Sequence, residues 1–203
     1  MNLWIPMADV LKPAKKGTAE LRCFEVDELA AERSKTREVA TRGREPAITA
    51  GCYVQLRING ELVMSDTPME KDTNEDFVRW ARGDVLIAGL GLGMVVLPLI
   101  RRAGVLSVTV IEKSQDVIDL VLPQLLAAVT PEEAAKLTVL RDDINTWKPP
   151  RRRWDYIYFD IWPGISRDNL PEMRALHRRF RPKLRKHGTV TSWLFEELAG
   201  GWL

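Results

Sequence analysis

Residues 84–100 read DVLIAGLGLGMVVLPLI, an apolar run with glycines at alternate positions, Gly89, Gly91 and Gly93. A helix that crosses a bilayer needs about 20 apolar residues, whereas this run is interrupted by glycines and is followed by two arginines. A membrane span is therefore disfavoured. Two interpretations remain: a close-packed structural turn without a ligand, or a cradle for a nucleotide-like cofactor.

The chain as a whole has the composition of an ordinary globular protein. It has 203 residues, of which 45% are hydrophobic and 29% are charged, and a net charge of +2. At this length we expect one domain, with at most a small appendage. The first residues lack the basic start, apolar core and small-residue cleavage site of a secretory signal. We therefore expect a cytoplasmic protein without a membrane partner.

The two cysteines do not predict a structural site. Cys23 and Cys52 have neither a CxxC spacing nor a histidine cluster nearby. A disulfide framework and a zinc site are both unsupported. We expect reduced, buried thiols and no metal.

Basic residues are concentrated in one segment. Residues 148–187 contain twelve Lys/Arg and four Asp/Glu, a local net charge of +8. Such a cluster is the electrostatic footprint of a polyanion such as nucleic acid. An arginine-rich, solvated helix face would give the same pattern, so both interpretations stay open.

The segment before the apolar run predicts an antiparallel hairpin. Residues 52–58 and 61–65 each alternate apolar and polar side chains, and Asn59-Gly60 separates them. Asn-Gly suits a type I′ turn, which needs a positive φ at both central residues. We predict a partly ordered N-terminal arm over residues 1–50, a hairpin and linker over 51–76, and the main domain over 77–203.

From residue 84 onward, short apolar segments alternate with helical ones. Such alternation is typical of βαβ units around a parallel sheet. Pro98 and Pro182 are expected to kink or break their helices. The predicted strands are 85–88, 105–111, 137–140, 156–159 and 189–194, and the predicted helices are 92–103, 115–128, 131–135 and 170–186.

The glycines follow the first strand of this series. Glycine there lets the chain turn tightly and lets a ligand approach the backbone, while the next helix offers free N–H groups. Glu112 ends the second strand, 19 residues after Gly93, where an acid can accept hydrogen bonds from both ribose hydroxyls. Glu112 could instead be an acid favoured at a helix N-terminus. Together the features indicate a ribose-bearing cofactor.

The third strand ends in a second pair of acids, Asp142 and Asp143. A carboxylate here could accept a hydrogen bond from an adenine amino group, with Ile144 and Trp147 as apolar contacts. Either acid could instead cap a helical turn. NAD is disfavoured, because the pattern GxGxG has Met94 where a dinucleotide fingerprint has its third glycine.

Residues 84–194 resemble the class I S-adenosylmethionine-dependent methyltransferases. The resemblance is carried by AGLGLG after the first strand, Glu112, Asp143, and Asp160 in DYIYFDIWPG at the fourth strand, and it covers a little over half of the chain. It implies an α/β fold, a Rossmann-like doubly wound sheet of five parallel strands in the order 3-2-1-4-5, preceded by an antiparallel hairpin. It also implies a transferase with S-adenosylmethionine as cofactor.

The resemblance assigns roles to the site residues. Gly89, Gly91 and Gly93 would line the methionine and ribose end, Glu112 would hold the ribose, and Asp143, with Asp142 beside it, would face adenine. Class I methyltransferases usually add antiparallel strands after the fifth strand, and the chain ends soon after it. We expect these strands to be missing and the sheet to be completed by the N-terminal arm or a second subunit.

Within that superfamily, the hairpin VQLRINGELVMSD is similar to the one that precedes the Rossmann-like domain in the spermidine synthase branch. In aminopropyltransferases the fourth strand ends in a DxxDP-like motif whose first acid helps to deprotonate the amine. Asp160 matches that acid, whereas Pro163 occupies the position of the second, which would help to bind a cationic polyamine. Aminopropyl transfer from decarboxylated S-adenosylmethionine is therefore the alternative to methyl transfer.

Asp160 is also a candidate from its position. It lies at the carboxyl end of a strand, where open α/β sheets bind ligands. A carboxylate there can orient an acceptor or take its proton, and Trp162 could wall the acceptor pocket and attract a cation. Alternatively, Asp160 caps a loop and Trp162 is a core residue. His177 and His187, in and after a basic helix, are poor catalytic candidates.

The sequence thus predicts methyl transfer to an unidentified acceptor, with aminopropyl transfer as the alternative. A third hypothesis is a non-catalytic interaction module that keeps the fold. Contact with nucleic acid through residues 148–187 and formation of a homodimer are further expectations.

Overall fold

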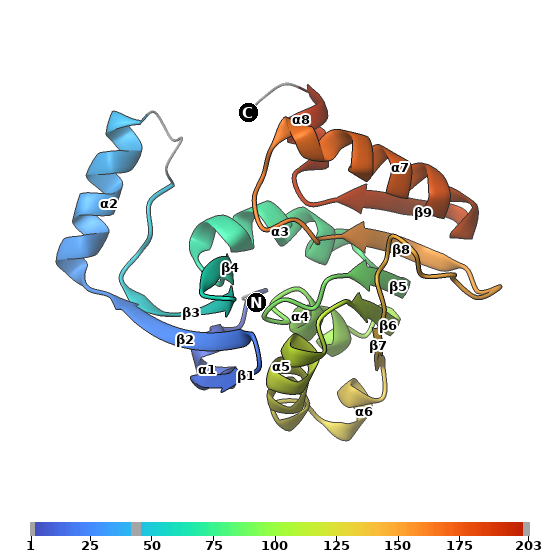
Figure 1. The fold of residues 1–203 in the computed structure, drawn as a ribbon, viewed down its shortest axis with the longest axis horizontal. Helices are drawn as coiled ribbons and strands as arrows, with labels where there is room; N and C mark the ends of the chain where they lie inside the picture. Colours follow the sequence, from blue (N-terminus) through green and yellow to red (C-terminus); the bar gives the residue numbers. More distant parts are fainter. Residues whose placement is uncertain (1–2, 42–45, 201–203) are drawn as a thin grey trace.

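The structure of the protein, a computed structural model, describes residues 3–41 and 46–200, which form two β-sheets (Figure 1). The first sheet is antiparallel, in the order β1-β2-β3-β4, and the second has the order β7-β6-β5-β8-β9. The strands are β1 (Ala14–Lys16), β2 (Ala19–Val26), β3 (Gly51–Ile58), β4 (Glu61–Ser65), β5 (Gly83–Ala88), β6 (Val105–Glu112), β7 (Leu137–Arg141), β8 (Trp154–Phe159) and β9 (Leu184–Ser192). The α-helices are α1 (Met7–Val10), α2 (Glu28–Ala40), α3 (Pro68–Trp80), α4 (Val96–Arg101), α5 (Gln115–Ala127), α6 (Pro131–Ala134), α7 (Leu170–Phe180) and α8 (Phe195–Gly200), with 3-10 turns at Arg167–Asn169 and Arg181–Lys183.

The second sheet is parallel throughout. Counted from β5, its strands lie in the order 3-2-1-4-5. In β5, Val85 and Ile87 join one core with α4 and α5, whereas Leu86 and Ala88 join the other with α7. Successive side chains of a strand point to opposite faces, so this apolar strand is covered on both sides, as an α/β parallel sheet requires.

The predicted hairpin is formed by β3 and β4. Asn59 and Gly60 have φ values of 53° and 82°, the positive values that a type I′ turn needs. The hairpin belongs to a larger sheet, because β2 pairs with β3 over all eight of its residues. The domain boundary predicted at residue 50 therefore falls inside one sheet.

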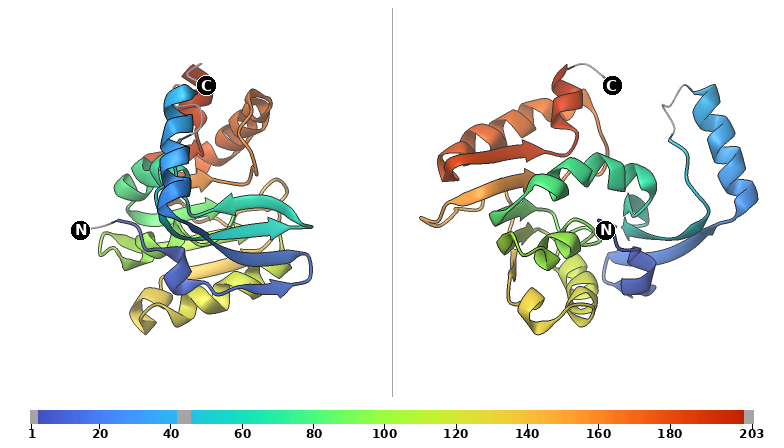
Figure 2. Two further views of the ribbon diagram at one scale, coloured as in Figure 1. Left: turned by 90° about the vertical axis from the view of Figure 1, so that its left-hand side faces the viewer. Right: turned by 180° about the vertical axis from the view of Figure 1, so that it is seen from behind.

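The N-terminal arm differs from the prediction in another way. The edge of the parallel sheet was expected to be completed by this arm or by a second subunit, but the arm pairs with the hairpin, and β7 and β9 are the edge strands of the parallel sheet. The helix α2 stands at the outer end of the antiparallel sheet, away from the other helices (Figures 1 and 2). Ala31 is the one residue of α2 that is buried. Residues 1–2 and 42–45 of the arm lie outside the described residues.

The cysteines were wrongly expected to be buried. Cys23 and Cys52 are free, exposed thiols. Cys23 pairs with Val54, and Cys52 pairs with Glu25 near the end of β2 and β3 that leads to α2. The residues that fill the core lie closer to the other end of β2, at Ala19 and Leu21.

Two predicted helices have different bounds. The helix predicted over 170–186 ends at Phe180, a 3-10 turn contains Pro182, and β9 begins at Leu184. Pro182 therefore breaks the helix as predicted. Pro98 does not break α4, because it lies in the first turn, where a backbone N–H has no intrahelical partner.

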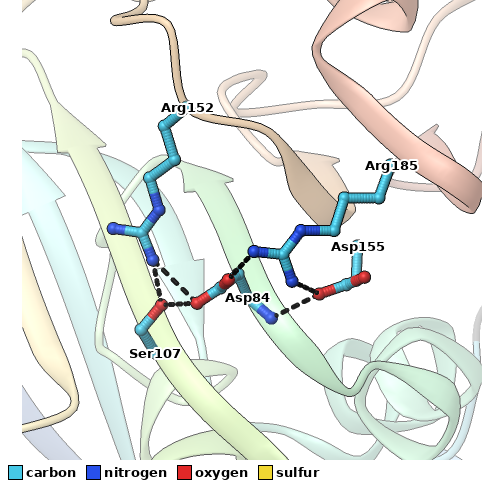
Figure 3. A network of polar contacts seen from close by, with 5 residues as sticks. All are labelled: Asp84, Ser107, Arg152, Asp155 and Arg185. Atoms are coloured by element: carbon cyan, nitrogen blue, oxygen red, sulfur yellow. Dashed lines mark hydrogen bonds and ion pairs between the residues drawn. The ribbon is translucent and has the colours of Figure 1, made fainter.

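A network of ion pairs joins the amino ends of the parallel strands (Figure 3). The carboxylate of Asp84 on β5 accepts from Arg152 at 2.7 Å and from Arg185 on β9 at 2.6 Å, and Arg185 also contacts Asp155 on β8 at 2.9 Å. Burial alone would raise the pKa of Asp84, but hydrogen bonds from Ser107 and Arg152 and the charges of both arginines bring it below its usual value. Two of the basic residues of segment 148–187 are thus used to hold the sheet together.

Candidate functional site

A cavity of about 410 Å³ lies at the carboxyl ends of the parallel strands. Its walls come from the loops after β5, β6, β7 and β8, from the first turn of α3 and from the hairpin β3–β4. Open α/β sheets bind ligands at this position. Of the predicted site residues, the cavity is lined by Gly89, Gly91, Glu112, Asp142, Asp143, Asp160 and Trp162.

The glycine loop has three residues in the left-handed region but two different roles. Gly89 has a φ of 96°, and a Cβ added to it would lie 2.1 Å from the carbonyl oxygen of Asp160. Gly93 has a φ of 72°, and a Cβ there would lie 2.3 Å from the side chain of Leu125 on α5. Gly89 therefore lets two strand ends approach beside the cavity. Gly93, predicted to line the cofactor site, instead permits close packing of α5 and is not among the lining residues.

The hairpin forms one wall above the glycine loop. Met64 of β4 lines the cavity, and its sulfur lies 3.4 Å from the backbone N–H of Leu92. A Cβ added to Gly91 would lie 2.5 Å from that sulfur. The methionine side chain is flexible, so this contact can yield to a ligand more easily than a backbone contact.

Glu112 ends β6 and is 9% exposed. Its Oε2 accepts from the backbone N–H of Leu90 at 2.8 Å, and its Oε1 accepts from the N–H of Ser114 at 2.7 Å. The N-cap of α5 is Ser114 itself, whose side chain accepts from Val117. Each carboxylate oxygen has two acceptor sites, so each keeps one for a further donor such as a ribose hydroxyl.

The acids after β7 have local partners. Asp143 lies 2.9 Å from the ammonium group of Lys113 and accepts from the N–H of Asn145, and these contacts hold its pKa below the usual value. Asp142 accepts from the N–H of Asp143. Both acids line the cavity, together with buried Ile144. Trp147, expected beside them, lies instead in the second core, against Trp154 and Phe180.

A pair of carboxyl groups faces the cavity from opposite elements. Asp160 follows β8, and Glu70 lies in the first turn of α3. Burial raises the pKa of Asp160 to about 7. Burial and the charge of Asp160 raise the pKa of Glu70 to about 8, although a hydrogen bond from the backbone of Ser65 lowers it. Both groups can therefore exchange a proton near neutral pH.

Glu70 was missed by the sequence analysis. The signal was present, because Glu70, Asn74, Phe77 and Val78 share the buried face of α3. Polar side chains at two positions of an apolar helical stripe are unusual and indicate a functional or hydrogen-bonding role. No helix was predicted over residues 68–80, so these four residues did not stand out as one face.

Two tryptophans complete the walls. Trp162 is buried in the second core, and its Nε1 donates to Glu172 at 2.7 Å, which fixes its ring. Trp193 lines the cavity and donates to the hydroxyl of Thr73 on α3 at 2.9 Å. Trp162 is thus both a core residue and a wall of the cavity.

The histidines lie outside the cavity lining. The Nε2 of His177 is 2.7 Å from the hydroxyl of Ser192, and burial, with the charge of Arg181, lowers the pKa of His177 to about 4. His177 also borders a second hollow of about 350 Å³, together with Arg174, Arg178, Arg181 and Phe195. The basic segment therefore divides into residues used in the fold and arginines on this surface.

Within residues 3–41 and 46–200, no group of three or more metal-ligating side chains is found. In the same described part of the chain, no helix has the length and apolar character needed to cross a bilayer.

No protein-family model and no curated protein matches the sequence. Solved structures of methyltransferases have a similar fold. The glycopeptide N-methyltransferase MtfA, complexed with S-adenosyl-L-homocysteine, is 21% identical, with a TM-score of 0.45 over 59% of this chain and 46% of that one. The methyltransferase CcbJ from Streptomyces caelestis is also 21% identical, with a TM-score of 0.46 over 60% and 48%. Coclaurine N-methyltransferase, bound to N-methylheliamine and S-adenosyl-L-homocysteine, is 17% identical, with a TM-score of 0.45 over 60% and 33%. The likeness is one of fold, and the chain spans less than half of the length of each of these proteins.

Proposed function

We propose that this protein is a cytoplasmic S-adenosylmethionine-dependent methyltransferase that acts on an unidentified acceptor. The observation that supports it is the meeting of the glycine loop, Glu112 and Asp160 in one cavity. When bound, S-adenosylmethionine supplies a methyl carbon activated by a sulfonium centre. The chain must then bind that molecule, position an acceptor and manage the acceptor's proton.

The residues present fit such a cofactor. Gly89 lets the loop approach the carbonyl oxygen of Asp160, and Gly91 lets it approach the sulfur of Met64, a flexible side chain that can yield to a ligand. Glu112 would accept from the ribose hydroxyls with the acceptor sites that its two backbone bonds leave free. Asp142, Asp143 and the apolar side chain of Ile144 would hold adenine.

Asp160 would orient the acceptor and take its proton. Burial raises its pKa to about 7, which is close to the pH at which a general base is most effective. The carboxyl end of β8 fixes its backbone, because the N–H of Asp160 donates to Ala88 on β5 at 2.9 Å. Its position relative to the glycine loop is therefore set by the sheet.

The second candidate is aminopropyl transfer from decarboxylated S-adenosylmethionine, as in the spermidine synthase branch. Its support is the charge of the cavity. Among the described residues that line it, one cation, Lys113, stands against six acids: Glu70, Glu112, Asp142, Asp143, Asp160 and Glu172. Lys113 is already paired with Asp143. A carboxylate on the cofactor would have to rely on backbone N–H groups, whereas a decarboxylated cofactor carries none.

The co-product distinguishes the two reactions. The protein is incubated with either cofactor and a panel of amines, alcohols, carboxylates and oligonucleotides, and the nucleoside product is measured by mass spectrometry. Methyl transfer leaves S-adenosylhomocysteine, whereas aminopropyl transfer leaves methylthioadenosine. Absence of both products, together with absence of cofactor binding, would overturn the proposal in favour of a non-catalytic module, for which salt-dependent binding of nucleic acid to residues 148–187 is the next test.

A further inference from the structure

The carboxyl groups of Glu70 and Asp160 have no cationic partner among the described residues. Glu70 is 8% exposed. The neighbouring cation, Lys71, lies 3.3 Å from Asp66, a fully buried acid that also accepts from the N–H groups of Met7 and Val54. Lys113, the cation of the cavity lining, is held by Asp143. A buried carboxylate without a partner is costly, so the pair requires an explanation.

The pair is held in place by a chain of contacts between α3 and β8. The hydroxyl of Tyr158 donates to Asn74 at 2.8 Å, and the amide of Asn74 donates to the carbonyl oxygen of Glu70 at 2.8 Å. The rings of Phe77 and Tyr158 are stacked, with centroids 4.0 Å apart. These contacts fix the turn that carries Glu70 relative to the strand that ends in Asp160. An arrangement this constrained is preorganised for a ligand.

We propose that Glu70 and Asp160 together bind the ammonium group of the acceptor, which is therefore an amine. The proposal rests on the methyltransferase function proposed above and adds the chemical class of its acceptor. A cation between the two acids relieves their mutual repulsion and satisfies the buried carboxylate of Glu70 and the half-buried one of Asp160. Trp162 and Trp193 supply aromatic walls, which attract cations and cover the apolar part of an amine.

The same pair would make the amine nucleophilic. A protonated amine has no free electron pair, so one N–H bond must break before the nitrogen can react. The proton passes to a carboxylate oxygen of the pair, and the bonding electrons stay on nitrogen as its lone pair. Burial raises the pKa of both groups toward neutrality, and the charge of Asp160 adds to the rise at Glu70, which suits the pair to this exchange.

The test measures binding of amines to the cofactor-free protein by calorimetry and ligand-observed NMR at pH 7.5. The probes are methylammonium and benzylammonium, with methanol and benzyl alcohol as neutral counterparts of similar shape. The wild-type protein is expected to bind both ammonium probes and to bind the alcohols about 10-fold or more weakly, because a charged hydrogen bond is lost. Calorimetry in buffers of different ionisation enthalpy should show proton release on binding.

The variant Glu70→Gln keeps the shape of the side chain and removes its charge. It is expected to weaken binding of the ammonium probes about 10-fold or more and to leave binding of S-adenosylhomocysteine unchanged. Asp72→Asn removes one charge from an exposed position of the same helix and is the matched control. Equal binding of ammonium and alcohol probes, or an unchanged affinity in Glu70→Gln, would overturn the proposal. Failure of the wild-type protein to bind S-adenosylhomocysteine would instead count against the methyltransferase function itself.

Discussion

The carboxylate of Glu112 accepts a hydrogen bond from the backbone N–H of Leu90 at 2.8 Å, so the acid at the end of β6 holds the glycine loop after β5. The second oxygen holds the start of α5 through Ser114. A residue predicted to hold a ribose thus also shapes the loop that approaches the cofactor. A substitution of Glu112 can therefore affect both the stability of the fold and the affinity for the cofactor, and both quantities must be measured to separate the two effects.

Glu112→Gln should lower the free energy of unfolding by about 1–2 kcal/mol, because the amide can offer one oxygen acceptor in place of two and its NH₂ would face an N–H donor. Urea unfolding followed by circular dichroism measures this. Glu61→Gln, at an exposed position of the hairpin, is the control and should leave stability unchanged. An unchanged stability in Glu112→Gln would mean that the hydrogen bond to Leu90 contributes nothing.

Gly91 and Gly93 should respond differently to alanine. Gly93→Ala should cost about 2–3 kcal/mol, because its Cβ would meet Leu125 at a positive φ, while cofactor affinity in the remaining folded protein is unchanged. Gly91→Ala should cost about 1 kcal/mol, because the contacted sulfur of Met64 can move, but it should weaken cofactor binding. Chemical denaturation and calorimetry on both variants check this. The reverse order of effects would contradict the assignment of Gly93 to packing.

Stability should fall as the pH rises from about 5 to about 8. Burial raises the pKa of Glu70 to about 8 and that of Asp160 to about 7, above the values that an unfolded chain has. The folded state therefore binds more protons than the unfolded state in this window, and the free energy of unfolding decreases with pH. Burial, with the charges of Asp160, Glu70 and Glu197, also raises the pKa of Tyr158 well above its usual value, and none of these groups is a cation.

Glu70→Gln should flatten this pH dependence and raise stability at pH 8 by on the order of 3 kcal/mol, since a buried charge no longer forms. Urea unfolding across the pH range measures the effect. Asp72→Asn should follow the wild-type curve. If the stability of Glu70→Gln decreased with pH as steeply as that of the wild type, Glu70 would not be the source of the pH dependence.

Asp84→Asn should destabilise the protein by about 1–2 kcal/mol at pH 7, because Arg152 and Arg185, both partly exposed to water, lose their shared carboxylate. Its depressed pKa means that this contribution is present above the ordinary Asp value and is lost as the pH falls through the folded value. The network joins the amino ends of the strands, so cofactor affinity should not change. A weakened cofactor affinity with normal stability would contradict a purely structural role.

The parallel sheet could be predicted because its strands are short, apolar and separated by turn residues, as in residues 85–88. The hairpin could be predicted because Asn59-Gly60 demands one turn geometry. The strand β2 could not, because its alternation of apolar and polar residues is interrupted at Cys23-Phe24 and the helix α2 separates it in the sequence from its partner β3. The start of β9 was predicted at residue 189 and lies at Leu184, because its first residues, Leu184 to His187, continue the basic composition of the preceding helix.

The site was predictable where a residue ends a strand, as Glu112 and Asp160 do, since the sheet order brings such ends together. Gly93 was predicted to line the cofactor site, but its Cβ position faces Leu125 on α5, because the pattern GxGxG does not say which glycine faces a ligand and which faces a helix. Glu70 was missed because its contact with the cavity depends on how α3 packs on β8 through Phe77 and Tyr158. That contact joins residues far apart in the chain, and no local pattern encodes it.

The most direct test of the account is isothermal titration of S-adenosylhomocysteine into the wild-type protein, Glu112→Gln and Glu61→Gln, with NAD as the negative ligand. The account predicts micromolar binding to the wild type and to Glu61→Gln, a loss of about 10-fold or more in Glu112→Gln, and no binding of NAD. An absence of binding by all three proteins, while each remains folded, would contradict it and make the glycine loop a structural turn.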